Sequence, residues 1–313
     1  MWLKIPKKIY VNKSNIDVGA GRGEHMGKEP IKTVFISCIV VTYQAADVLE
    51  QALLSLIGQT YKPEIIVVDG GSEDGTKELL ERYKKDIDTI ISEPDNGIYD
   101  AMNKGVKYAN GEYVYFLGAD DCLLRPDTIE RVIKSLNSTR PDVLYGPVMI
   151  VKEDTHLEKV SFVEAGDDAF QNNNHLAHQG MFCRRMLLLE HPFELKYRIC
   201  ADHEFVLWLF YEYHATFVKF NEPVAYYSDG GTSSQCLLEM RKESIEIMRQ
   251  YNFSPIVIDN YQNKIKRSRF RALLRSWKSF IKLIAKRMGI LNMLSIHQGW
   301  APHHCNWKDC RWQ

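Results

Sequence analysis

The sequence predicts an α/β protein whose central sheet is mainly parallel and doubly wound. Short runs of β-branched and aliphatic residues alternate with segments whose apolar residues recur every three or four positions, as strands and amphipathic helices do. The first two runs are apolar almost throughout, which is typical of strands buried on both faces of a sheet. Polar clusters follow three of the runs, at the sheet edge where such proteins bind ligands.

The predicted fold begins with a strand and a helix. Residues 34–42 have the sequence Val-Phe-Ile-Ser-Cys-Ile-Val-Val-Thr, a β-rich run that predicts a buried strand. Over residues 48–56 the apolar side chains recur at spacings of three and four, and Gly58 stands where a helix would stop, so we expect a helix there. A second apolar run, residues 65–69, predicts the next strand.

The alternation then continues along the chain. Ser72 or Asp74 can cap a helix that reaches Arg82. The elements expected after it are a strand at 89–91, a turn at 95–97, a helix over 100–109, an aromatic strand at 113–117, a helix over 128–138, strands at 143–145 and 147–151, and a helix over 203–213. The part beyond Pro126 is less regular than the first half.

Composition and cysteine usage exclude several classes of protein. With 45% hydrophobic and 26% charged residues in 313, the chain has the composition of a globular protein and not of a disordered or fibrous one. Its seven cysteines are odd in number and lack paired spacing, which argues against a disulfide framework and favours a reducing cytoplasm. No apolar stretch suits a signal peptide or a membrane span of about 18 residues. We therefore expect a cytoplasmic protein.

The charges are balanced overall but unevenly distributed. Residues 264–287 contain ten Lys or Arg and no acid, whereas residues 1–263 hold 28 basic and 39 acidic residues, a net charge of minus eleven. On an ideal helix, the apolar side chains of residues 270–288 gather on one side and the basic ones on an adjacent flank. Such a helix either packs on the protein or lies on an anionic membrane, the role we favour. The negative remainder argues against nucleic acid as a partner.

Two adjacent carboxylates, Asp120 and Asp121, follow the strand expected at 113–117. Adjacent carboxylates repel each other unless a cation lies nearby, and hard oxygen ligands suit Mg²⁺ or Mn²⁺. The alternative is an ordinary capped turn ahead of the next helix. Similarly, Asp69 precedes two glycines that let the backbone approach a ligand closely, but the same pattern fits a common strand-to-helix turn.

Five segments then occur in a specific order. They are Val40–Gln44, Ile66–Thr76, Glu93–Gly105, Ala109–Asp121 and His178–Phe182. In order and spacing they resemble the family 2 glycosyltransferases of the GT-A fold, over about residues 34–230. The subgroup that the chain most resembles builds bacterial surface polysaccharides. The resemblance therefore implies a GT-A, Rossmann-like sheet with a helical extension at its C-terminal side.

The resemblance implies a set of donor-binding residues. Thr42 and Asp69 would hold the nucleotide base and the ribose. Asn96 and Lys104 would lie near the diphosphate or the sugar, although by themselves they indicate only a turn and a solvated charge. The family usually has an aspartate where Gly70 stands here.

The resemblance also implies a metal site and a base. Asp120 and Asp121 would be equivalent to the Asp-x-Asp motif, binding the ribose and, through Mn²⁺ or Mg²⁺, the diphosphate. Gly118 replaces the leading carboxylate of the commonest form of that motif, so the division of work between the two aspartates stays open. Asp202 matches the catalytic base, and Ala201 stands where a glutamate often precedes it.

Three further residues are candidates for the acceptor side. His178 could position an acceptor hydroxyl or be a core histidine amid apolar neighbours. Gln179 follows it in the same segment, and Glu204 is the next candidate for the base after Asp202. In contrast, His303, Cys305 and Cys310 lack the usual zinc spacing.

The activity implied is an inverting transfer of a sugar from a nucleoside-diphosphate sugar, most simply a UDP-sugar, to a hydroxyl of a lipid-linked glycan or polysaccharide precursor. The enzyme would lie on the inner face of the cell membrane. An alternative in another class is a non-catalytic sugar-nucleotide-binding or scaffolding subunit. Nucleotidyl transfer is disfavoured because no phosphate-binding glycine loop with a basic residue follows the first strand.

The same interpretation divides the chain into parts. The expected divisions are a leader at 1–32, a catalytic domain at 33–235 with a nucleotide-sugar half (33–125) and an acceptor half (126–235), C-terminal helices with the basic segment at 236–290, and a tail at 291–313.

Overall fold

A computed structural model describes residues 35–151, 158–228 and 236–266. The chain forms two compact units, residues 1–257 and 258–313, and the first contains every element named below. Residues 258–266, the described part of the second unit, are helical. Within the described ranges, no helix has the combination of length and hydrophobicity that crossing a membrane requires. The expected leader, the tail and nearly all of the basic segment lie outside the described residues.

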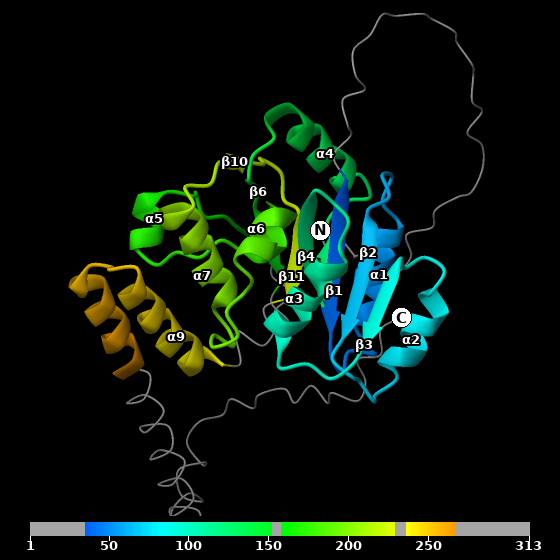
Figure 1. Cartoon of the computed structure of the whole chain (residues 1–313), viewed down its shortest axis with the longest axis horizontal. Helices are drawn as coiled ribbons and strands as arrows, with labels where there is room; N and C mark the ends of the chain where they lie inside the picture. Colours follow the sequence, from blue (N-terminus) through cyan, green and yellow to red (C-terminus); the bar gives the residue numbers. More distant parts are fainter. Residues whose placement is uncertain (1–34, 152–157, 229–235, 267–313) are drawn as a thin grey trace, which may run out of the picture. The chain divides into compact units, whose positions relative to one another are not determined.

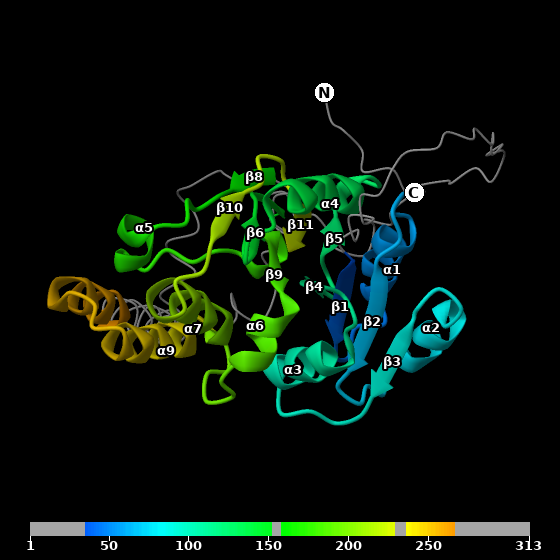
Figure 2. The same cartoon turned by 45° about the horizontal axis from the view of Figure 1, so that its top comes forward.

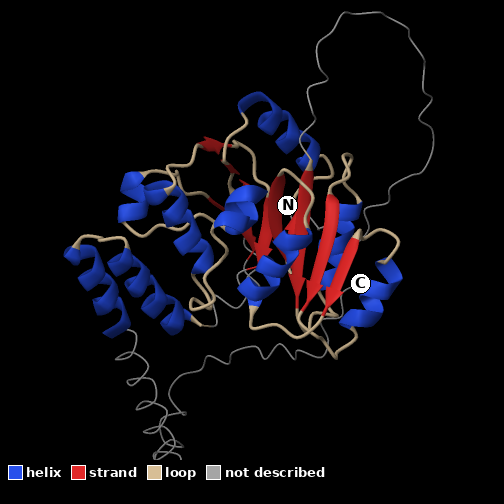
Figure 3. Ribbon diagram, in the orientation of Figure 1, coloured by secondary structure: helices blue, strands red, loops and turns tan. Residues whose placement is uncertain are grey.

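The larger sheet has seven strands in the order β10-β6-β9-β4-β1-β2-β3 (Figures 1 and 3). Their bounds are β1 Ile36–Thr42, β2 Glu64–Asp69, β3 Thr89–Ser92, β4 Tyr113–Gly118, β6 Val143–Tyr145, β9 Met181–Arg184 and β10 Phe217–Lys219. Strands β4, β1, β2 and β3 are mutually parallel, as are β10 and β6. Only β9 runs antiparallel, between β4 and β6. The prediction of a mainly parallel sheet is confirmed.

A smaller sheet of four strands has the order β5-β11-β7-β8. Its strands are β5 Cys122–Leu123, β7 Val148–Val151, β8 Glu158–Ser161 and β11 Ala225–Ser228. The strand expected at 147–151 therefore exists as β7, but it pairs in this second sheet. Because β5 follows β4 after only three residues, the smaller sheet begins beside Asp120 and Asp121.

Helices cover both faces of the larger sheet (Figures 1 and 2). The helices are α1 Leu49–Ile57, α2 Thr76–Tyr83, α3 Ile98–Tyr108, α4 Thr128–Thr139, α5 Asp167–Gln171, α6 Arg185–Glu190, α7 Ala201–Leu207 and α9 Leu237–Gln250, with a short 3-10 helix η1 at His178–Gly180 and a π-helix η2 at Trp208–Glu212. The helix expected over 203–213 is thus α7 continued by η2. Helix α3 begins two residues before its expected start.

The main core lies between the sheet and helices α1, α2 and α4. In β1, Cys38 and Val40 face this core, whereas Ile39 contacts Gly105 of α3 on the other face. All seven residues of β1 are buried, as its apolar sequence predicted, since a central strand covered on both faces exposes neither set of side chains to water. This packing fixes the strand ends that carry the candidate site.

Candidate active site

The ends of the parallel strands bring the predicted polar clusters together. Thr42, the last residue of β1, pairs in register with Asp69, the last residue of β2. Val41 pairs with Gly118, which leads to Asp120 and Asp121. The expectation that these clusters meet at one edge of the sheet is therefore confirmed, because parallel strands end on the same side.

The loop after β1 is held by side chains of the loop after β2. Three successive backbone N–H groups each donate to a different side-chain oxygen, namely Gln44 to Ser72 Oγ at 2.8 Å, Ala45 to Thr76 Oγ1 at 3.0 Å and Ala46 to Asp74 Oδ2 at 3.0 Å. The Thr76 hydroxyl also donates to Asp74 Oδ1 at 2.6 Å, and this bond, followed by the one from the Ala46 N–H, lowers the pKa of Asp74. The two loops consequently form one fixed wall of the site.

Asp69 is completely buried and anchors this wall. Its carboxylate accepts hydrogen bonds from the backbone N–H and hydroxyl of Ser72 and from the hydroxyl of Ser92, the last at 2.6 Å. Beside it, the hydroxyl of Thr42 is buried and has no hydrogen-bond partner in the described part of the chain. A buried hydroxyl without a partner is costly, so Thr42 has a group available for a ligand.

We expect Ser72→Ala to lower the free energy of unfolding by about 1–3 kcal/mol, since it removes one hydrogen bond from the buried carboxylate of Asp69 and the acceptor of the Gln44 N–H. Urea unfolding at neutral pH measures the change. The control is Ser138→Ala, which removes an exposed hydroxyl bonded to its own helix. Equal losses in the two variants would contradict the role assigned to Ser72.

Tyr43 was assigned no role from the sequence, although it forms with Thr42 one of the three polar clusters expected at the strand ends. It follows Thr42 at the end of β1, and 64% of the residue is exposed although it is aromatic. An exposed aromatic ring at a ligand-binding edge can stack on a flat ring of a ligand. The signal available was its place beside Thr42 in the first of the five motifs.

Asn96 and Lys104 lie on the loop and helix that follow β3. Lys104 Nζ is 3.0 Å from a carboxylate oxygen of Glu93 and 3.5 Å from one of Asp100. Partial burial opposes its charge, but these two acids raise the pKa of Lys104. The backbone and the side chain of Asn96 both donate to Asp100. Contact of either residue with a diphosphate or a sugar stays a prediction.

Asp120 and Asp121 stand above Gly118, where a Cβ atom would come within 2.6 Å of Asp121 Oδ2 and 3.2 Å of Asp120 Oδ1. Asp120 is exposed and Asp121 is buried. Each oxygen of Asp121 accepts one hydrogen bond at 3.1 Å, Oδ1 from the Ser228 N–H and Oδ2 from Gln179 Nε2. Glycine at position 118 is thus required for the carboxylates to approach the strand end.

The electrostatics of this pair suit a divalent cation. Burial, followed by the charge of Asp120, raises the pKa of Asp121 to about 6. A buried carboxylate beside a second one is relieved by a cation with a preference for hard oxygen ligands, such as Mg²⁺ or Mn²⁺. The donor set of Asp120 and Asp121 therefore fits the metal that the sequence predicted.

Asp202 is the second residue of helix α7, and its carboxylate lies in a network of three hydrogen bonds. Oδ1 accepts from the Tyr99 hydroxyl at 2.7 Å and from the His203 N–H at 2.9 Å, and Oδ2 is 3.1 Å from His178 Nδ1. Burial disfavours its charge, but the bonds from His178 and Tyr99 prevail and lower the pKa of Asp202 to about 2. Asp202 is therefore ionised at neutral pH.

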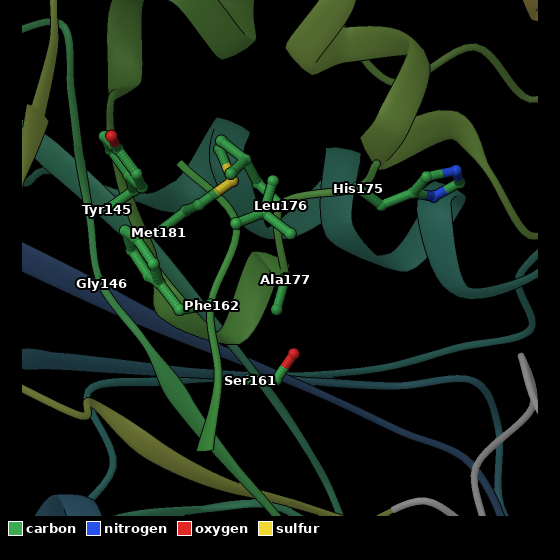
Figure 4. A pocket seen from close by; sticks show the side chains of 9 residues that line it. Tyr145, Gly146, Ser161, Phe162, His175, Leu176, Ala177 and Met181 are labelled. Atoms are coloured by element: carbon green, nitrogen blue, oxygen red, sulfur yellow. The ribbon is translucent and has the colours of Figure 1, made fainter. Parts of the chain in front are cut away.

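An apolar pocket borders this carboxylate. Phe116, Phe193 and Phe205 line it together with His178 and Asp202. Apolar walls limit the access of water to a charged group and strengthen its interactions. A second pocket is lined by residues between positions 145 and 181. The side chains of Tyr145, Phe162 and Met181 converge there, and His175 points away from them (Figure 4).

Two adjacent residues of η1 link Asp121, a predicted metal ligand, to Asp202, the predicted base. His178 contacts Asp202, and Gln179 contacts Asp121. The antiparallel strand β9 follows η1 directly, so its first residues lie at the edge where the parallel strands end. The Tyr115 hydroxyl of β4 donates to the Gln179 carbonyl at 2.9 Å. The structure thus brings together four residues that are spread over positions 121–202 of the sequence.

Glu204 lies apart from this network. It is fully buried, and its carboxylate accepts from the Tyr251 hydroxyl at 2.8 Å and lies 3.2 Å from His191 Nε2. Side-chain oxygens of Glu194 and Glu204 and a ring nitrogen of His191 lie within 4.8 Å of one another, but Glu194 is also paired with Lys196 at 2.6 Å. The acceptor role of Glu204 stays a prediction.

The His178–Asp202 pair should make stability depend on pH. Burial opposes protonation, yet Asp202 raises the pKa of His178 above its usual value. The folded state then binds this proton more tightly, so the stabilisation is complete below the unfolded pKa of about 6.5 and is lost as pH rises through the folded value. We expect His178→Gln to lower the melting temperature more at pH 5.5 than at pH 8.5. Replacement of the exposed His214 by Gln is the control, and equal shifts for His178→Gln at both pH values would contradict the pairing.

Comparison with known proteins identifies the family of the chain. The model of "Glycosyl transferase family 2" matches residues 37–191. A "PGL/p-HBAD biosynthesis glycosyltransferase" of Mycobacterium tuberculosis is 35% identical over 175 residues, which cover 54% of this chain and 67% of the relative.

Two solved structures are similar in fold. TarS of S. aureus (residues 1–349) in complex with UDP-GlcNAc has a TM-score of 0.54 at 17% identity, covering 74% of this chain and 71% of that one; a longer TarS chain is covered to 42%. The mannosyltransferase PcManGT of Pyrobaculum calidifontis, in complex with GDP-Man and Mn²⁺, has a TM-score of 0.55 at 17% identity, covering 78% and 72%. The chain belongs to glycosyl transferase family 2 and has the GT-A fold.

Proposed function

We propose that the protein is a metal-dependent, inverting glycosyltransferase that moves a sugar from a UDP-sugar to a hydroxyl of a lipid-linked glycan or polysaccharide precursor. The observation that carries this proposal is the link through His178 and Gln179 between Asp202 and Asp121. This link joins the ionised carboxylate of Asp202 to Asp121, which with Asp120 suits a metal ion. Transfer of a sugar from a diphosphate to a hydroxyl needs a base for the hydroxyl proton and a cation for the charge of the leaving diphosphate.

The donor would bind along the ends of β1, β2 and β4. The unpartnered hydroxyl of Thr42 and the exposed ring of Tyr43 suit the nucleoside, and the wall anchored by Asp69 holds both in place. Asp120 and Asp121 would hold Mn²⁺ or Mg²⁺, which when bound stabilises the charge of the departing diphosphate. UDP and UDP-GlcNAc in TarS favour a uridine donor, and GDP-Man in PcManGT is the competing choice.

Asp202 would act as the general base. Its low pKa keeps it ionised, and the neighbouring apolar pocket limits competing water. Removal of the proton from the acceptor hydroxyl lets its oxygen attack the anomeric carbon directly. A single displacement of this kind inverts the anomeric centre and needs no nucleophile from the protein.

The acceptor and the location belong to the same proposal. The mycobacterial relatives are named as glycosyltransferases of PGL/p-HBAD biosynthesis, which supports an acceptor that is itself a biosynthetic intermediate. The basic, amphipathic segment at 264–287 supports peripheral contact with the anionic inner face of the cell membrane, with the catalytic part in the cytoplasm. The non-catalytic alternative is less well supported, because the relatives are glycosyltransferases.

A nucleotide panel tests the proposal with the full chain. UDP with Mn²⁺ should raise the melting temperature more than ADP, GDP or UDP with chelator, because a ligand of the native state stabilises it. UDP release from UDP-GlcNAc, UDP-glucose and UDP-galactose then separates an enzyme from a binding subunit. Stabilisation without UDP release from any donor, in the presence of a lipid-linked glycan extract, would favour the scaffold instead.

A further inference from the structure

The two oxygens of Asp202 have different surroundings. Oδ1 accepts two hydrogen bonds, from the Tyr99 hydroxyl and the His203 N–H, whereas Oδ2 has His178 Nδ1 as its single hydrogen-bond partner in the described part of the chain. A carboxylate oxygen has about two lone-pair positions. Oδ1 is therefore filled and Oδ2 retains one open position.

Tyr99 and Asp202 come from different helices, α3 and α7. Tyr99 is the second residue of α3, is 5% exposed and packs its ring against Phe193 with centroids 5.3 Å apart. Helix α3 follows the loop of Asn96 and carries Lys104. The hydroxyl of Tyr99 thus connects Asp202, the predicted base, to helix α3, which carries the predicted donor-binding residue Lys104.

The single proton of the Tyr99 hydroxyl has two acceptors within reach. Asp202 Oδ1 lies at 2.7 Å and the Ile199 carbonyl oxygen at 2.8 Å. A hydrogen bond to a charged acceptor is the stronger one, so the proton belongs to Asp202 while that carboxylate is ionised. Ile199 itself is fixed, because its N–H and that of Cys200 both donate to Glu243 of α9.

We propose that Tyr99 is a positioning residue that occupies Oδ1 of Asp202 and so directs proton transfer to Oδ2. This rests on the proposed role of Asp202 as the base. In the step, the acceptor O–H bond breaks and its proton goes to Oδ2. The acceptor oxygen forms a bond to the anomeric carbon, and the bond from that carbon to the diphosphate oxygen breaks, the electron pair leaving with the UDP.

The obvious variant keeps the ring and removes only the hydroxyl. Tyr99→Phe should lower kcat about tenfold and leave the donor KM within about twofold, since the lost bond orients the base and does not touch the donor. The matched control is Tyr113→Phe, which removes another buried hydroxyl, bonded to the Pro141 carbonyl at the far end of β4. The control should retain the activity of the parent.

A double-mutant cycle separates positioning from general damage. If Tyr99 acts through Asp202, adding Tyr99→Phe to Asp202→Asn should cost no further activity. UDP release from the most active UDP-sugar of the panel is the measurement. An unchanged kcat for Tyr99→Phe, or an equal loss in both backgrounds, would overturn the assignment.

A second readout does not need turnover. Carbon-13 NMR of the Asp202 carboxyl, identified by its loss in Asp202→Asn, should show a higher pKa in Tyr99→Phe than in the parent, because a hydrogen bond to the ionised form has been removed. No change would disprove the bond itself. Full activity of Asp202→Asn, in contrast, would refute the role of Asp202 as the base. The NMR measurement would still report whether Tyr99 donates a hydrogen bond to Asp202.

Discussion

Asp202→Asn should keep the affinity of the parent for UDP with Mn²⁺ while kcat falls by about 10²-fold or more, the usual loss for a missing general base. The amide has the size of the carboxylate and can still accept from Tyr99, but it cannot take a proton at neutral pH. Calorimetry with UDP and Mn²⁺ and a measurement of UDP release in the presence of acceptor give the two quantities separately.

Glu204→Gln is the informative partner of that variant. Because Glu204 is fully buried and bonded to Tyr251 and His191, its change should lower the melting temperature and leave the kcat of the folded protein near that of the parent. The opposite result, with Asp202→Asn active and Glu204→Gln inactive but folded, would move the base to Glu204.

Asp121→Ala should abolish metal-dependent binding of UDP. The substitution removes a buried, hard oxygen ligand and leaves the diphosphate charge without its counter-ion at a position where burial strengthens the interactions of charges. Calorimetry with UDP, with Mn²⁺ and with chelator, measures the effect. Asp121→Asn should lose the metal dependence as well, since it keeps the shape of the side chain but not its charge.

The matched control for this prediction is Asp86→Ala, which removes an exposed carboxylate after α2 and changes the net charge equally. It should bind UDP and Mn²⁺ as the parent does. Parental affinity in Asp121→Ala, or an absence of metal dependence in the parent protein, would refute the metal assignment.

The strands at the centre of the sheet could be predicted because their signal is local. Strands β1 and β2 are buried on both faces, so most of their residues are apolar and the pattern is visible without knowledge of any partner. Strand β9 could not be predicted in this way. Its four residues end in Arg184 and become a strand only by pairing with β4 and β6, which are distant in sequence.

The same distinction applies to the candidate site. Thr42 and Asp69 end strands and Asp121 follows one, so the rule for strand ends in parallel sheets locates them. The pairing of His178 with Asp202 depends on the antiparallel course of β9, and only the family resemblance indicated either residue. Tyr99 gave no signal at all, because its bond to Asp202 spans 103 residues and its aromatic ring is equally typical of a helix buried in a core.

The loop after β1 has one more consequence, which follows from its three occupied amides. Backbone N–H groups at such a position often bind the phosphates of a nucleotide, but those of Gln44, Ala45 and Ala46 already donate to side chains of the neighbouring loop. These three amides are therefore not free to bind a diphosphate. If the proposed metal site holds the diphosphate, occupancy by the nucleotide sugar would then depend on the free concentration of Mg²⁺ or Mn²⁺ as well as on the concentration of the sugar nucleotide itself.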